Sequence, residues 1–72
     1  MNRSAFLARL REGLTGLAQE DIDELISDYE AHFTEGAAAR RSDDDVARAL
    51  GDPNRLAREL RAEAGFRKWE AK

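Results

Sequence analysis

The 72-residue sequence contains no cysteine, one proline and one histidine, and these shortages argue against several classes of protein. Without cysteine there is no disulfide framework and no thiolate metal site, so stability has to come from helix packing or from a partner. A chain this short buries only about 60% of the surface that it exposes when unfolded, which disfavours a deep substrate pocket. We therefore expect a single domain over residues 1–72, with no catalytic chemistry, no metal, no cofactor and no small-molecule substrate.

Long apolar runs are also missing. The start Met1-Asn2-Arg3-Ser4 has none, so no signal peptide is expected. No stretch approaches the roughly 18 to 20 consecutive apolar residues that cross a bilayer. Charged residues make up 38% of the chain and apolar residues 42%, which is typical of a helical domain with one solvated face. The chain is accordingly expected to be soluble and cytosolic.

The net charge of -3 conceals two blocks of opposite sign. Between residues 15 and 47, ten acidic residues stand against two arginines, whereas from residue 53 onward six basic residues stand against three glutamates. Neither block is a pure run of one sign, so solvated helix faces are the simpler interpretation. A basic tail that lies near anionic lipid or an acidic partner is the alternative.

Apolar residues recur at three- and four-residue spacing, which predicts an all-α fold, a compact bundle of four helices. The first helix is expected over residues 3–14, with Ser4 as its cap and Gly16 placed to end it. The second is expected over residues 18–39, and its inward stripe comprises Ile22, Leu25, Ile26, Tyr29 and Phe33. The other face of this helix is acidic and carries Asp21, Asp23, Glu24, Asp28 and Glu30.

Capping residues predict the third helix over residues 43–50 and the fourth over residues 53–70. Ser42 is a cap residue, and three aspartates follow it where exposed N–H groups favour negative charge. Gly51 can adopt the left-handed conformation that closes a helix, and Asp52 can cap the next one. Pro53 suits a first helical position because no N–H is needed there. A tight Gly-Asp-Pro junction should therefore join the last two helices.

His32 is the only histidine, and no nucleophile accompanies it in the sequence. Asp28, His32 and Glu35 share a helix face at spacings of four and three, but one helix rarely closes a metal site. A surface hydrogen bond between Asp28 and His32 is the simpler expectation, and a small metal-dependent enzyme is the alternative.

Residues 46–60 have the pattern of a helix-turn-helix, with glycine in the turn and a basic second helix. A DNA-binding module is therefore an alternative function. Three aspartates precede this unit and Asp52 lies in its turn, so repulsion would oppose docking on phosphates. Nucleic acid is not the expected partner.

Four segments together resemble the bacterial HAAS signalling-domain family. They are Phe6-Leu7-Ala8-Arg9-Leu10, Leu14-Thr15-Gly16-Leu17, Asp28-Tyr29-Glu30-Ala31-His32-Phe33-Thr34-Glu35-Gly36 and Leu50-Gly51-Asp52-Pro53-Asn54-Arg55-Leu56-Ala57. The resemblance implies an N-terminal cytosolic helical domain without enzyme activity, usually followed by transmembrane helices and often encoded beside PadR-like transcriptional repressors. The sequence departs from the family in having Ala18 where proline is usual, and in stopping at Lys72 before any membrane span.

The predicted function is therefore a non-enzymatic interaction or signalling domain at the cytosolic face of the inner membrane. Its expected partner is a protein, either a PadR-like regulator or a second copy of the chain. The candidate partner-binding residues are Asp21, Glu24 and Asp28, on the acidic face of the second helix. The residues expected to fix the shape through packing and capping are Tyr29, Phe33, Leu50, Gly51, Asp52, Pro53 and Leu56.

The C-terminal end supplies candidates for a membrane-proximal surface: Phe66, Arg67, Lys68 and Trp69. Cationic and interfacial aromatic side chains collect at the cytosolic face of membranes. At about 100° per residue, Phe66 and Trp69 fall away from the apolar stripe of the fourth helix. The alternative is that Gly65 loosens this helix and the two aromatics fold back on the first helix.

Overall fold

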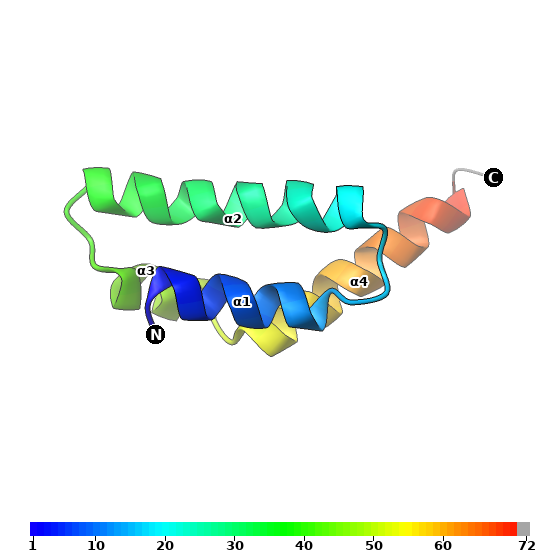
Figure 1. Cartoon of the computed structure of the whole chain (residues 1–72), viewed down its shortest axis with the longest axis horizontal. Coiled ribbons are helices and arrows are strands. Elements are labelled where there is room, and N and C mark those ends of the chain that lie inside the picture. Colours follow the sequence, from blue (N-terminus) through cyan, green and yellow to red (C-terminus); the bar gives the residue numbers. More distant parts are fainter. Residues whose placement is uncertain (71–72) are drawn as a thin grey trace.

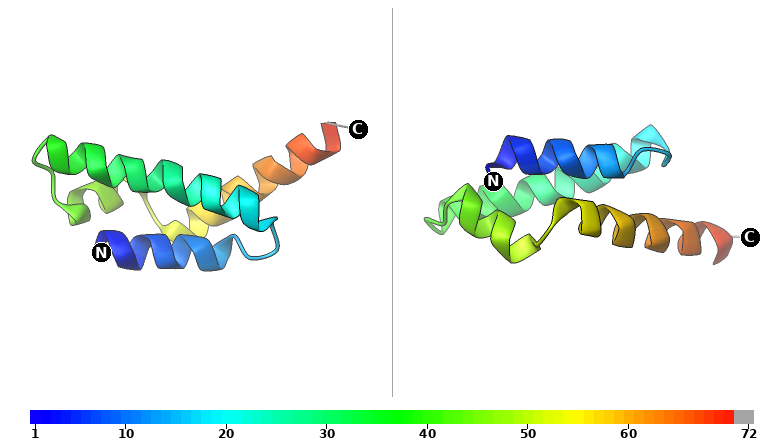
Figure 2. Two further views of the ribbon diagram at one scale, coloured as in Figure 1. Left: turned by 45° about the horizontal axis from the view of Figure 1, so that its top comes forward. Right: turned by 90° about the horizontal axis from the view of Figure 1, so that it is seen from below.

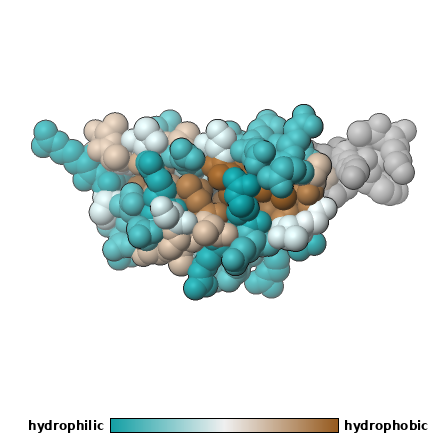
Figure 3. Space-filling model, in the orientation of Figure 1, coloured by the Kyte–Doolittle hydropathy of each residue, from teal (hydrophilic) through white to brown (hydrophobic). Residues whose placement is uncertain are grey.

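A computed structural model describes the backbone of residues 1–70 and the side chains of residues 1–64. Its helices are α1 (Arg3–Gly13), α2 (Gln19–Ala38), α3 (Asp43–Leu50) and α4 (Pro53–Glu70), so the predicted all-α bundle of four helices is confirmed. α1 and α2 lie antiparallel, and α4 extends beyond both of them at the end of the molecule opposite the N-terminus (Figure 1). On the face shown in Figure 3, apolar side chains are recessed between rims of polar ones.

α1 is the helix on which the other three pack. Its Phe6 and Leu10, and Leu14 directly after it, are completely buried. The rings of Phe6 and Phe33 lie 5.4 Å apart and tilted by 59°, a geometry that aromatic pairs favour. Burial of each such side chain contributes about 1.5–3 kcal/mol. The core is completed by Ile22, Ile26, Phe33, Val46, Ala47 and Ala57.

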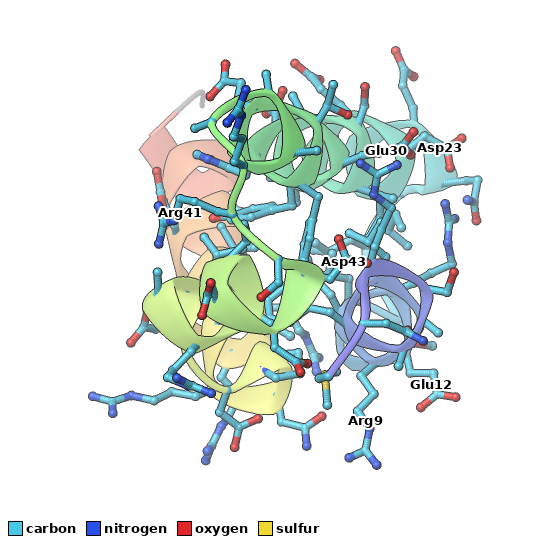
Figure 4. The ribbon with its side chains drawn as sticks, turned by 90° about the vertical axis from the view of Figure 1, so that its left-hand side faces the viewer. Arg9, Glu12, Asp23, Glu30, Arg41 and Asp43 are labelled. Atoms are coloured by element: carbon cyan, nitrogen blue, oxygen red, sulfur yellow. The ribbon has the colours of Figure 1, made fainter. Side chains whose placement is uncertain are left out.

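The cap of α1 differs from the predicted one. Ser4 lies inside the helix, and Asn2 is the cap, because its Oδ1 accepts a hydrogen bond from the N–H of Ala5 at 2.8 Å. A second acceptor comes from α3, where Asp43 Oδ2 accepts from the N–H of Arg3 at 3.0 Å. Figure 4 shows Asp43 directed from α3 toward the first turn of α1. The prediction of Ser4 was wrong because Asn2 is an equally good cap two residues earlier.

The N-terminal ends of α1 and α3 therefore lie side by side. Both ends carry unsatisfied N–H groups and partial positive charge, which would repel each other if nothing intervened. Asp43 bonds across this junction, and Asp44 pairs with the α-amino group of Met1, whose hydrogen bond and charge lower the pKa of that carboxyl. Two of the three aspartates, Asp43 and Asp44, thus serve the start of α1 as well as that of α3.

The junction between α3 and α4 is formed by Gly51, Asp52 and Pro53. Gly51 has φ of 91° and ψ of -161°, a positive-φ conformation that glycine adopts without strain but that differs from the left-handed helical one predicted for it. The carboxylate of Asp52 accepts a hydrogen bond from the N–H two residues ahead at 2.9 Å, and Pro53 begins α4 and is buried. Leu50 and Leu56 flank this junction and are half-buried against the core.

α2 ends in a Schellman motif whose left-handed position is occupied by arginine instead of the usual glycine. The N–H of Arg41 donates to the carbonyl oxygen of Gly36 at 2.8 Å, and the N–H of Arg40 donates to that of Ala37 at 3.0 Å. Arg40 has φ of 62°, in the left-handed region that this motif requires. Since a side chain at this φ is strained, the connection between α2 and α3 holds a local cost.

α1 and α4 lie close together where two small residues meet. A Cβ added to Gly13 would lie 2.5 Å from the Cβ of Ala57, which is 1% exposed. Because both carbons attach directly to helix backbone, neither could rotate away. The distance between these two helices therefore depends on glycine at position 13.

Gly13→Ala is expected to lower the free energy of unfolding by about 1–2 kcal/mol, because overpacking at Ala57 outweighs the roughly 1 kcal/mol that alanine gains in helix propensity. Urea denaturation measures this change. Adding Ala57→Gly to Gly13→Ala should reverse part of the overpacking, and the double-mutant cycle isolates the contact. A Gly13→Ala chain more stable than wild type would contradict the close approach.

Arg40→Gly is expected to raise the free energy of unfolding by about 1 kcal/mol, because glycine adopts a left-handed φ without strain. Arg41→Gly is the matched control, since Arg41 has no positive φ, and glycine there should destabilise. Thermal melts of both variants provide the comparison. Equal effects at the two positions would be inconsistent with the Schellman motif.

Candidate functional site

An open groove lies between α2 and α4. Over the residues that the structure describes, both helices pack on α1 and neither packs along the other. The C-terminal half of α4 leaves the bundle at an angle to α2 (Figure 2). One wall is formed by the connection after α1 and one face of α2, within residues 16–35. The other wall is formed by residues 60–64 of α4. The groove is therefore present because α2 and α4 both pack on α1 and diverge from each other.

The floor of the groove is apolar and only half-buried. It is formed by Leu17, Leu25, Tyr29 and Leu60, each of which packs against the core on one side. Helix geometry explains the position of the two side chains from α2. The reference point is the middle of the sector formed by the buried Ile22, Ile26 and Phe33. At about 100° per residue, Tyr29 lies roughly 40° and Leu25 roughly 80° from that point. These side chains leave apolar surface open to water.

The rim of the groove is acidic. Asp21, Glu24 and Asp28, the predicted partner-binding residues, are all exposed and all line the groove. Glu35 and Glu63 line it as well, and Arg61 is the one arginine in the described lining. The structure therefore gathers the three predicted residues beside apolar surface. The sequence pattern predicts these three residues as a partner-binding acidic face but does not predict the apolar surface beside them.

The other acids of α2 have a different role. Asp23 lies toward α1, and its Oδ1 is 3.2 Å from Nη1 of Arg11 on that helix. The same oxygen accepts a hydrogen bond at 2.9 Å from Nε2 of Gln19, one turn earlier on α2. These hydrogen bonds, from Gln19 first and then Arg11, lower the pKa of Asp23. Figure 4 shows Asp23 and Glu30 away from the side of α2 that faces the groove. The acidic residues predicted on one face of this helix therefore lie on two faces, one along the groove and one away from it.

Tyr29 lies at the centre of the groove, and its predicted place in the core needs correction because it is only half-buried. Burial raises the pKa of its hydroxyl, and the negative charges of Glu63, Asp28 and Glu59 raise it further. The phenol therefore stays protonated and can donate a hydrogen bond. Phe33, on the same helix, is 1% exposed and has the expected core position.

His32 contacts Tyr29, with ring centroids 5.5 Å apart and a tilt of 37°. No hydrogen bond joins His32 to Asp28 within the described residues, so the simple surface pair expected from their spacing does not form. Across the same part of the chain, no group of three His, Asp or Glu side chains is placed to hold a metal ion. The histidine belongs to the groove lining.

The predicted membrane-proximal side chains, Phe66, Arg67, Lys68 and Trp69, lie outside the described side chains. The backbone of α4 continues as helix through Gly65 to Glu70. None of the helices, over the residues described, combines the length and apolar character needed to cross a membrane. The residues of the helix-turn-helix pattern form α3 and α4, which do not pack along each other.

The titration of Tyr29 tests the charges around the groove, because it is the only tyrosine of the chain. Its pKa is expected above that of free tyrosine, and Asp28→Asn with Glu63→Gln should lower it. Stability carried by the protonated phenol is complete below the pKa of unfolded tyrosine, and is lost as pH rises through the higher folded value. Ultraviolet difference spectra follow the phenolate. Glu12→Gln, on another face, should leave the pKa unchanged; an equal change would contradict the assignment.

The comparison with known proteins gives one match. The sequence model of the HAAS family matches residues 5–59, which include almost all of α1, the whole of α2 and α3, and the first part of α4. No curated protein matches the chain, and no solved structure does. The match covers the wall formed within residues 16–35 and the Gly-Asp-Pro junction, and it ends one residue before the wall formed by residues 60–64. It confirms the resemblance seen in the sequence. The chain belongs to the HAAS family.

Proposed function

We propose that this chain is a non-enzymatic interaction domain that binds a partner protein in the groove between α2 and α4. The observation that carries the proposal is the acidic rim of Asp21, Glu24 and Asp28 above the half-buried Leu25 and Tyr29. An apolar floor within a polar rim is the usual arrangement of a protein interface.

The physical contributions of the two parts differ. Covering apolar surface contributes about 25 cal/mol for each Å² removed from water. Charges at the rim steer the encounter and select the partner more than they add affinity. The groove follows about 25 Å of α2, from residue 18 to residue 35, at 1.5 Å per residue. A helix of four or five turns in the partner would fit that length, in the manner of helix-in-groove recognition.

Membership of the HAAS family supports a more specific form of the proposal. The domain would be the cytosolic N-terminal part of a membrane protein and would pass information to a PadR-like regulator encoded beside it. The basic end of the chain, with Arg67, Lys68 and Trp69, suits a position near the membrane surface. A role without catalysis agrees with the groove lining, which offers carboxylates, His32 and Arg61 but no hydroxyl or thiol other than that of Tyr29 among the described residues.

Reversing the rim charges tests the groove as the binding site. The triple variant Asp21→Lys, Glu24→Lys, Asp28→Lys should weaken binding at least tenfold to the purified PadR-like regulator that is encoded beside the domain. The reason is that the lysines would repel a cationic surface of the partner. Calorimetric titration measures the dissociation constant. All three side chains are exposed, so circular dichroism should show unchanged folding.

The matched control is Glu12→Lys, Glu20→Lys, Glu30→Lys, which makes the same change in net charge at exposed positions outside the groove. Binding by this control should stay within about twofold of wild type. Undiminished binding by the groove variant would remove this surface from the function.

A further inference from the structure

The end of α4 has the chemistry that the groove lacks. Residues 65–72 contain Phe66 and Trp69, with Arg67, Lys68 and Lys72 against the single Glu70. The groove has an apolar floor and, among its described lining, five carboxylates against one guanidinium. Aromatic and cationic groups on one segment are complementary to apolar surface rimmed by carboxylates.

The end of α4 cannot enter the groove of its own chain. Residues 60–64 of α4 form one wall of that groove, and the helix continues without a break to Glu70. At 1.5 Å per residue, the six residues after Ala64 carry the helix about 9 Å farther along its own axis. The right-hand view of Figure 2 shows this end diverging from α2. The end can therefore meet such a groove only in another molecule.

Each chain has one groove and one α4 end. Two copies related by a two-fold axis could each place the end in the groove of the other, which gives a closed pair with two equal contacts. The groove lining from residue 18 to residue 35 is about 25 Å long, which exceeds the roughly 9 Å that residues 65–70 of α4 span as helix. The groove has room for the whole segment.

We propose that the groove binds a second copy of this chain through residues 65–72, which are the last six residues of α4 and the two that follow it in the sequence, with Arg67 and Lys68 against the rim carboxylates and the aromatic side chains over the floor. This inference rests on the proposed function, since it names the partner of the same groove. It adds that the domain is a two-fold dimer in which acidic and basic halves of the sequence meet between molecules.

Sedimentation equilibrium of the full 72-residue chain over a wide concentration range tests the dimer. The wild-type chain should dimerise, and higher salt should weaken it because charge pairs at a rim are screened. Glu24→Lys with Asp28→Lys, and separately Arg67→Glu with Lys68→Glu, should each raise the dissociation constant at least tenfold. The four substitutions together should bring it back to within about threefold of wild type, because the charges are then exchanged.

The matched control is Arg9→Glu with Arg58→Glu, which makes the same change in net charge at exposed positions. This control should dimerise like the wild type. A chain that stays monomeric at every concentration would overturn the proposal. So would a dimer that remains intact in either charge-reversal variant, or one that is not restored in the variant that carries all four substitutions. Binding of a monomeric chain to anionic phosphatidylserine vesicles through Arg67 and Lys68 would also overturn it, and would assign the segment to the membrane.

The two proposals fail in different ways. If the wild-type chain is monomeric while the groove variant still loses the regulator, the interaction function stands and the dimer does not. If the chain dimerises as described but the regulator binds the groove variant normally, the groove is a self-association site and the regulator binds elsewhere.

Discussion

The fold depends on the buried side of α1. Phe6, Leu10 and Leu14 are completely removed from water, and α2, α3 and α4 all pack on this one helix. In a chain of 72 residues without cysteine, no disulfide can hold the helices, and the residues whose side chains are described form one core. The positions of α2, α3 and α4 therefore depend on the surface of α1 that each of them covers. The Gly13 contact with Ala57 shows how closely α4 has to approach it.

The groove is a consequence of that shared support. α1 is 11 residues long, whereas α2 has 20 and α4 has 18, so the longer helices extend beyond the surface that joins them. Where α2 and α4 diverge, Leu25 and Tyr29 keep only one side packed. The acids then fall into two groups, since Asp23 ties α2 to α1 while Asp28 faces the groove. Because α1 is too short to cover both longer helices, apolar side chains remain open to water beside acidic ones, and such a surface is suited to a partner.

Local signals in the sequence were sufficient for the helices. Spacing of apolar residues, the Ser42 cap and the residues Gly51 and Pro53 each act within a few positions, so they could be interpreted without the fold. The groove could not be predicted, because it depends on the angle between α2 and α4, which no local pattern encodes. The apolar sector of α2 is about 100° wide and extends through Leu25, roughly 80° from the middle of the buried Ile22, Ile26 and Phe33; this width was the available sign. Asp43 as a second acceptor for α1 also required the tertiary structure.

The central claim is that α1 supports the other three helices, and hydrogen exchange of the native chain tests it most directly. The backbone amides of Leu10 and Leu14 should exchange only through global unfolding, and more slowly than those of the last two turns of α4. Removing the support should unfold everything at once. Exchange of the α1 amides well before those of α2 and α3 would show that the bundle survives without α1, and would contradict the account.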